Sequence, residues 1–263
     1  MKEEIIKIDG INLFYKEFGS KNTNSTIIIL HGWGGNSNSW IDVGDLLASS
    51  GNRVIIPDLP GFGNTNLTSV FSLEKYSKLI IKLAKKLKLS NIVLIGHSNG
   101  GAISIKISTS SELKIKKLIL NNSAGIRNNS LRTIKRKLLL NFSKLGKKVL
   151  KLTKLENNSF YKKFRINFYK LIGSVDYVNS EKSIYLNETY KNIISSDLRN
   201  TLGDIKIKTY LIWGSKDSYT PLSDGYIFNK LIKDSKLIIL KKQKHGIHIF
   251  NPKLLAENIL NIL

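Results

Sequence analysis

The six residues GHSNGG at positions 96–101 are the most informative stretch of this chain. They follow a short apolar run at 91–95 and precede a segment, 102–109, that can form a helix. The pattern G-x-S-x-G between a buried strand and a helix predicts a sharp turn, which strains the backbone of Ser98 and presents its hydroxyl group above the sheet. Only small residues two positions away, here Gly96 and Gly100, fit against such a turn. The backbone N–H of Asn99 then faces any negative charge that develops on a bound carbonyl group.

Length and composition limit what kind of protein this is. A chain of 263 residues can bury a sizeable core and suits one α/β domain with an insertion. The absence of cysteine excludes a disulfide scaffold and thiolate chemistry, and it fits a reducing compartment. The N-terminus lacks the apolar core of a signal peptide, and no apolar run approaches the roughly 20 residues that span a bilayer. We therefore expect a soluble, cytoplasmic protein.

The net charge of +23 raises the question of nucleic-acid binding. The excess is mostly lysine, it is spread over the whole chain, and it accompanies heavy use of isoleucine and asparagine. This distribution indicates a compositional bias rather than a binding surface. Since no zinc-finger spacing, RNP-like aromatic motif or helix-turn-helix signal accompanies the charge, the sequence predicts no nucleic-acid partner.

A hairpin followed by alternating strands and helices predicts the fold class. Residues 5–8 and 11–18 alternate around Asp9-Gly10, which is typical of an antiparallel hairpin. Further strands are expected at 26–30, 53–56, 91–95, 115–120, 209–213 and 237–240, and helices at 40–50, 73–89, 222–232 and 252–263. Such alternation favours an α/β fold with a mostly parallel, doubly wound sheet.

Residues 125–200 interrupt this alternation. They lack strand-like runs and carry 17 basic against 5 acidic residues. Between Leu131 and Leu152, apolar residues recur every three or four positions with lysine and arginine between them, so this part predicts an amphipathic helix. Such a helix could lie on an anionic membrane surface or pack its apolar side against the rest of the protein. We favour packing, as part of an inserted helical cap.

Four signatures in the expected order connect the chain with a known superfamily. They are HGWGG at 31–35, DLPGFG at 58–63, the serine turn, and a late aspartate and histidine. With these, the chain resembles the α/β-hydrolase superfamily, in its serine-nucleophile, lid-containing branch. The resemblance implies eight strands, of which the second is antiparallel, and a lid after the sixth strand. It assigns residues 1–124 and 201–263 to a catalytic domain and 125–200 to a helical cap.

The resemblance also implies a catalytic triad of Ser98, Asp217 and His245, in the hydrolase order. Asp217 lies in WGSKDSYTP at 213–221, which reproduces the family pattern G-x-x-D-x-x-x-P after a strand. Asp197 and Asp204 also compete as the acid. Both precede the strand at 209–213, however, and so do not lie at its carboxyl end, where such sites form.

Four histidines compete for the role of general base. His31 and His97 lie inside motifs in which family members use histidine structurally. His245 stands seven residues before Pro252, as the family pattern requires, while His248 is three residues too late and suits a packing or pocket-rim role. The sequence departs from the pattern in having lysine before His245, where glycine is usual, and phenylalanine at 250, where an acidic residue is common.

In the implied mechanism, Ser98 attacks an acyl carbonyl and the backbone N–H groups of Asn99 and Trp33 hold the oxyanion. His31 and Gly32 support the loop that carries Trp33. No metal or organic cofactor is required. The serine argues against the haloalkane dehalogenase and epoxide hydrolase branches, which use aspartate as the nucleophile.

The sequence therefore predicts hydrolysis of a carboxylic ester or thioester of a small, apolar acyl substrate. A carbon–carbon bond hydrolase of the meta-cleavage type remains an alternative. Those enzymes usually carry asparagine before the nucleophile and tryptophan after the catalytic histidine, where this chain has His97 and Gly246. A ligand-binding protein of hydrolase fold with little turnover is the other alternative. Membrane contact through the basic cap is a less favoured addition.

Overall fold

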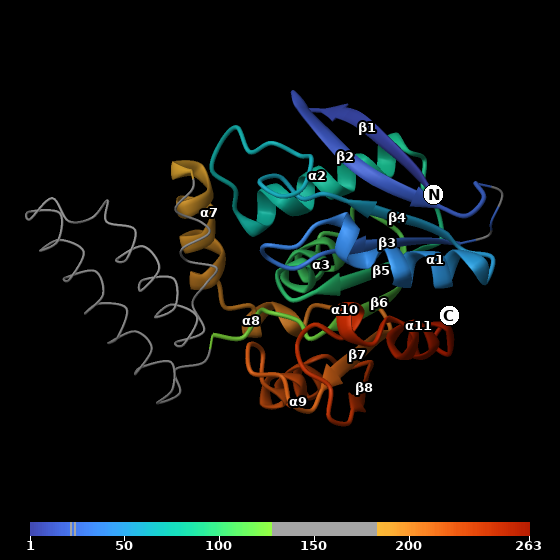
Figure 1. Cartoon of the computed structure of the whole chain (residues 1–263). Coiled ribbons are helices and arrows are strands. Elements are labelled where there is room, and N and C mark those ends of the chain that lie inside the picture. Colours follow the sequence, from blue (N-terminus) through green and yellow to red (C-terminus); the bar gives the residue numbers. More distant parts are fainter. Residues whose placement is uncertain (22, 24, 128–182) are drawn as a thin grey trace, which may run out of the picture.

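A computed structural model describes residues 1–21, 23, 25–127 and 183–263. Its centre is one eight-stranded sheet in the order β1-β2-β4-β3-β5-β6-β7-β8 (Figure 1). β2 pairs antiparallel with both β1 and β4, and every other neighbouring pair is parallel. The strands are β1 (Lys2–Ile8), β2 (Ile11–Phe18), β3 (Thr26–Leu30), β4 (Arg53–Pro57), β5 (Ile92–His97), β6 (Ile115–Asn121), β7 (Thr209–Gly214) and β8 (Ser235–Leu240). The predicted fold class and its antiparallel second strand are confirmed.

Helices cover both faces of this sheet and form two separate cores. One core holds apolar residues of α2, α3, α8 and α9, and the other those of α1, α10 and α11. The helices are α1 (Ile41–Ser49), α2 (Leu73–Lys86), α3 (Asn99–Thr109), α7 (Ile184–Ser195), α8 (Arg199–Leu202), α9 (Leu222–Leu231), α10 (Ile247–Phe250) and α11 (Pro252–Leu260), with a 3₁₀ turn, η1 (Ser37–Trp40), before α1.

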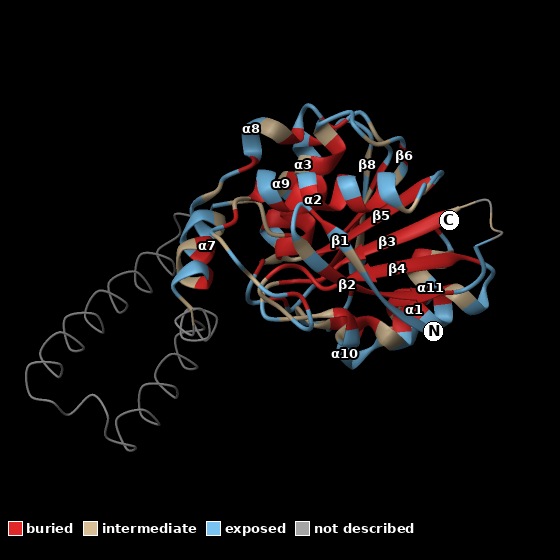
Figure 2. Cartoon of the chain, turned by 90° about the horizontal axis from the view of Figure 1, so that it is seen from above, coloured by how far each residue is buried: buried red, intermediate tan, exposed pale blue. Residues whose placement is uncertain are grey.

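β3 shows why the central strands read as continuous apolar runs. All five of its residues are buried, and its side chains alternate between the cores: Ile28 and Leu30 enter one, Ile27 and Ile29 the other. A strand covered on both faces has no polar side to expose, so the period-2 signal disappears. Figure 2 shows this buried centre, with exposed surface on the outer sides of the helices, on β1 and on the connecting loops.

Three predicted boundaries differ from the structure for local reasons. The helix expected at 40–50 begins as η1, where Asn36 accepts a hydrogen bond from the N–H of Asn38. α2 ends three residues before the expected 89, because Lys88 adopts a left-handed conformation with φ of 50°. α3 begins at Asn99, three residues earlier than expected, since the carbonyl of Ser98 already accepts the N–H groups of Gly101 and Ala102.

α7 and α8 lie between β6 and β7, where the cap was predicted. α7 stands at the end of the molecule opposite the two chain termini (Figure 1). The amphipathic segment from Leu131 to Leu152 lies outside the described residues. Among the residues that are described, no helix has the length and apolar character to cross a membrane.

Candidate active site

The turn between β5 and α3 has the strained geometry that its sequence predicts. Ser98 has φ of 50° and ψ of −118°, a conformation that a residue other than glycine rarely adopts. A Cβ atom added at Gly96 would lie 2.4 Å from the hydroxyl oxygen of Ser104, and one at Gly100 would lie 2.1 Å from the carbonyl oxygen of Leu30. The two glycines therefore permit the close packing that holds this turn.

Backbone hydrogen bonds fix the turn from both sides. The N–H of Ser98 donates to the carbonyl of Asn121 at the end of β6, over 3.2 Å. The carbonyl of Ser98 accepts from the N–H groups of Gly101, Ala102 and Ala124, over 2.9, 3.3 and 2.9 Å. Ser98 is thus held by its own helix and by the segment after β6, which leaves little freedom for its backbone.

The loop after β3 lies directly against this turn. A Cβ atom at Gly32 would lie 3.1 Å from the Cβ of Ser98, so a larger residue would force its neighbours to shift by a few tenths of an ångström. His31, which is fully buried, holds the loop: its Nε2 accepts the N–H of Leu59 over 2.9 Å, and its Nδ1 lies 2.8 Å from the carbonyl oxygen of Gly32. Because Nε2 accepts, the proton lies on Nδ1 and donates to Gly32. Burial lowers the pKa of His31, which favours this neutral form.

Trp33 connects the loop with α7. Its indole ring packs against Phe62 at 4.9 Å and against Tyr190 of α7 at 5.1 Å between ring centroids. Trp33 therefore connects the loop beside Ser98 with α7. Asn99, on the other side of Ser98, is the first residue of α3, and the first N–H groups of a helix have no partner within it.

Hydrogen bonds of Asp58 hold the loop at 58–63 against its neighbouring segments. The buried carboxylate of Asp58 accepts the N–H of Ser37 over 2.6 Å and that of Asn64 over 2.8 Å. A Cβ atom at Gly63, where φ is 54°, would lie 2.0 Å from this carboxylate. These contacts hold the loop in a rigid turn.

Asp217 and His245 meet at the carboxyl ends of β7 and β8. Their side chains are joined by a 2.7 Å contact between Oδ2 and Nδ1; the aspartate is fully buried and the imidazole is about one-fifth exposed. Asp217 also accepts the N–H groups of Tyr219 and Thr220, over 2.7 and 3.0 Å, and the Thr220 hydroxyl lies 2.9 Å from Oδ2. The carboxylate is therefore held in one orientation toward the imidazole.

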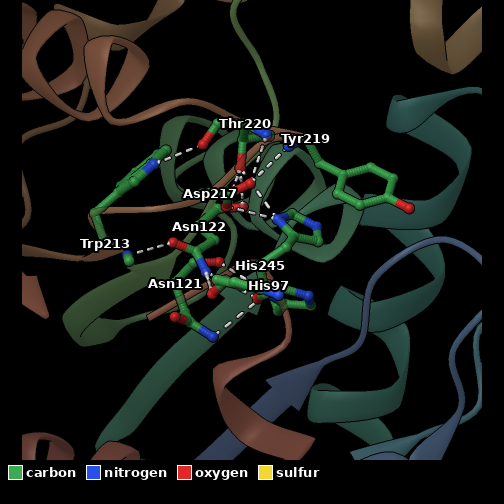
Figure 3. Close-up of polar contacts among 10 residues, drawn as sticks. His97, Asn121, Asn122, Trp213, Asp217, Tyr219, Thr220 and His245 are labelled. Carbon is green, nitrogen blue, oxygen red and sulfur yellow. Dashed lines mark hydrogen bonds and ion pairs between the residues drawn. The ribbon is translucent and has the colours of Figure 1, made fainter. Parts of the chain in front are cut away.

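Asn122, which the sequence analysis did not single out, links these two loops (Figure 3). Its Oδ1 accepts the N–H of Gly214, at the end of β7, over 2.9 Å. Its Nδ2 donates to the backbone carbonyl of His245 over 2.8 Å, and its own carbonyl accepts the Thr220 hydroxyl over 3.0 Å. One buried side chain thus sets the position of the loop with the acid relative to the loop with the imidazole.

His97 lies between the serine turn and the pair formed by Asp217 and His245. Its ring lies 4.7 Å from that of His245 and 4.4 Å from that of His248, and His248 stacks on Trp40 at 4.4 Å. Burial and, to a smaller extent, the neighbouring imidazoles lower the pKa of His97 well below its ordinary value and that of His248 to about 3. Both rings are therefore neutral at physiological pH, and His248 is a buried packing residue.

The competing carboxylates take no part in this arrangement. Asp197 pairs with Arg199 at the start of α8, and the guanidinium lowers the pKa of its carboxyl group. The backbone N–H of Asp204 bonds to the carbonyl of Thr201 in the turn after α8. No group of three or more potential ligands among the described residues could hold a metal ion.

Comparisons with known proteins show the family of this chain. The family model of the alpha/beta hydrolase fold matches residues 25–252. A pimeloyl-[acyl-carrier protein] methyl ester esterase of Wigglesworthia glossinidia brevipalpis is 30% identical over 94% of this chain and 95% of its own length. Lipase 1 of Psychrobacter immobilis is 26% identical over 90% of this chain and 75% of its own length.

The structural comparison gives the same fold. An esterase from Exiguobacterium antarcticum superposes with a TM-score of 0.75 at 22% identity, over 98% of this chain and 97% of that one. Together, the family match and the relatives show that the chain belongs to the α/β-hydrolase fold family and is a hydrolase of the esterase/lipase type.

Proposed function

We propose that this protein hydrolyses carboxylic esters through an acyl-enzyme on Ser98, with His245 as general base and Asp217 as its orienting acid. The observation that carries the proposal is the 2.7 Å contact of the buried Asp217 carboxylate with Nδ1 of His245. This contact fixes the proton on Nδ1 and leaves Nε2 able to accept a proton. The strained turn at Ser98 supplies the third member.

The reaction then follows from these positions. Nε2 of His245 takes the Ser98 hydroxyl proton as the oxygen attacks the ester carbonyl, and the imidazolium returns this proton to the leaving alcohol. The backbone N–H groups of Asn99 and Trp33 stabilise the oxyanion, and each such donor contributes about 10²–10³ in rate. A water molecule, deprotonated by His245, then releases the acid. These groups supply nucleophile, base and charge stabilisation without a metal or an organic cofactor.

The predicted cap, of which α7 and α8 are described, would border the acyl side of the site. The contact between Trp33 and Tyr190 supports this position for the cap, since it joins α7 to the oxyanion loop. The name of the 30% identical relative adds a specific ester class, methyl esters of an acyl chain. Methyl esters therefore belong in any substrate panel.

The test is steady-state hydrolysis of p-nitrophenyl and methyl esters of increasing acyl length, with Ser98→Ala as the control. We expect turnover that disappears in the variant, with an optimum that reports the length of the acyl pocket. Turnover that survives in Ser98→Ala would overturn the assignment of the nucleophile. A folded wild-type protein that turns over none of these esters would instead favour carbon–carbon bond substrates or ligand binding without catalysis.

A further inference from the structure

The side chain of Asn99 is buried without a hydrogen-bond partner. Only 3% of the residue is exposed, and neither Oδ1 nor Nδ2 has a hydrogen-bond partner among the described residues. Native proteins rarely leave both ends of a buried amide unsatisfied, because each group loses its bonds to water on burial. Both groups are therefore open to a partner from outside the described residues.

The position of Asn99 identifies where that partner comes from. Asn99 follows Ser98 directly, and consecutive Cα atoms are about 3.8 Å apart. The next two positions pack tightly against the protein: Gly100 against the backbone of Leu30, and Gly101 against Ser123. Asn99 therefore lies in the short stretch of α3 that borders the nucleophile.

Asn122 shows what a structural asparagine in this site looks like. It is also fully buried, yet its Oδ1 and Nδ2 both have protein partners, at 2.9 and 2.8 Å. The two asparagines lie on neighbouring segments, because the segment after β6 holds the carbonyl of Ser98 through Ala124. The asparagine side chain thus has both polar atoms hydrogen-bonded at position 122 and neither hydrogen-bonded at position 99.

We propose that the Asn99 side chain is a substrate-recognition group for a hydroxyl or amide function on the acyl chain, near the ester carbonyl. This inference rests on the proposed ester hydrolysis and adds the chemical class of the acyl group. The amide of asparagine has both donors and an acceptor, and both kinds are unpartnered. A hydroxyl or amide function can satisfy both kinds, whereas a carboxylate or an ammonium group satisfies only one.

The experiment compares pairs of methyl esters that differ only in a hydroxyl group or only in an amide N–H group. Methyl 3-hydroxybutyrate is paired with methyl 3-methylbutyrate, and the methyl ester of N-acetylglycine with methyl 4-oxopentanoate. For wild type we expect kcat/KM about tenfold higher for the hydrogen-bonding member of at least one pair, and which pair shows it distinguishes hydroxyl from amide recognition. In Asn99→Leu the ratio within each pair falls to one or below. The ratio is independent of any change in overall activity. A ratio of one for both pairs in wild type would overturn the inference.

Thermal unfolding gives a second readout that needs no turnover. Leucine fills a similar volume without unpartnered polar atoms, so Asn99→Leu raises the Tm. The matched control is Asn52→Leu: Asn52 is also buried, but its Nδ2 donates to the carbonyl of Leu47 over 2.9 Å, and its loss lowers the Tm. A Tm that falls equally in both variants would show that the protein already satisfies Asn99, and would contradict the inference.

Failure of the proposed function is distinguishable from failure of this inference. If no ester is hydrolysed, the four esters are compared as protectors of Ser98 against a fluorophosphonate, which measures binding alone. Stronger protection by the hydrogen-bonding member of a pair, lost in Asn99→Leu, supports recognition by Asn99. Equal protection by both members of each pair refutes it.

Discussion

The two halves of the site use their polar groups in opposite ways. On the side of the acid and the imidazole, the carboxylate of Asp217 and the amide of Asn122 have all their oxygen and nitrogen atoms in hydrogen bonds. Around Ser98 and His97, by contrast, lie the five buried side-chain atoms without a partner in the described part of the chain: Nε1 of Trp40, Oδ1 and Nδ2 of Asn99, Oδ1 of Asn121 and Nδ1 of His248.

The half whose polar atoms are all hydrogen-bonded has a fixed geometry, and the half with unpartnered atoms can respond to a ligand or to pH. A saturated network has one favourable arrangement, and removing one member leaves others unpaired and misplaced. Unpartnered buried atoms lower stability, but they remain available to a ligand, a water molecule or a proton. Variants of the first half should therefore reduce catalysis, and variants of the second should change selectivity or pH dependence.

The largest effect is expected from Asp217→Asn. Asparagine keeps an acceptor for the N–H groups of Tyr219 and Thr220 but removes the charge that holds the proton on Nδ1 of His245. A wrong imidazole tautomer costs about 10⁴-fold in kcat in serine proteases, and a similar loss is expected here. Ester hydrolysis at saturating substrate measures it. The control is Asp197→Asn, which changes an exposed ion pair; equal losses in the two variants would contradict the assignment.

The next effect is expected from removing the side chain of Asn122. Its φ of 44° lies in the left-handed region, so Asn122→Gly removes the amide without backbone strain. The loops of Asp217 and His245 then lose their common anchor, and a misplacement of about 1 Å lowers kcat by about 10²-fold with little change in KM. The neighbouring Asn121→Ala is the control, since its Oδ1 is unpartnered. A similar kcat in both variants would argue against a positioning role for Asn122.

A smaller effect concerns stability at low pH. The unfolded chain protonates His248 near pH 6.5, but in the folded protein burial lowers its pKa to about 3. Its neutral state therefore contributes stability above pH 6.5 that is lost as the pH falls toward 3, by about 1 kcal/mol per pH unit. In His248→Phe, which retains a ring to stack on Trp40, the free energy of unfolding should fall less steeply over this range. Parallel slopes for wild type and variant, from urea unfolding at each pH, would refute this explanation.

Much of the fold could be predicted because it is encoded locally. The β1–β2 hairpin follows from alternation around Asp9-Gly10, and β3 and β5 follow from short apolar runs before conspicuous loops. Boundaries were less accurate where a single backbone conformation decides them, as at Lys88, because side-chain periodicity does not report φ.

The residues proposed for catalysis could be named from motifs, but the residues that hold them in position could not. Asn122 lies two positions after the end of the predicted strand at 115–120, and a polar residue at that edge was the one available signal. Its partners at 214 and 245 are about 90 and 120 positions away, and no spacing rule connects them. The stack of His248 on Trp40 spans more than 200 positions and depends on how α10 packs against η1.

The most direct test of Ser98 as the activated nucleophile is its labelling by a fluorophosphonate, followed by mass spectrometry. We expect one adduct on the peptide that contains Ser98, formed rapidly in wild type and far more slowly in His245→Ala and Asp217→Asn. An adduct on another residue, or an equal rate in all three proteins, would contradict it, because Ser98 would then not be activated by the pair that the structure joins at 2.7 Å.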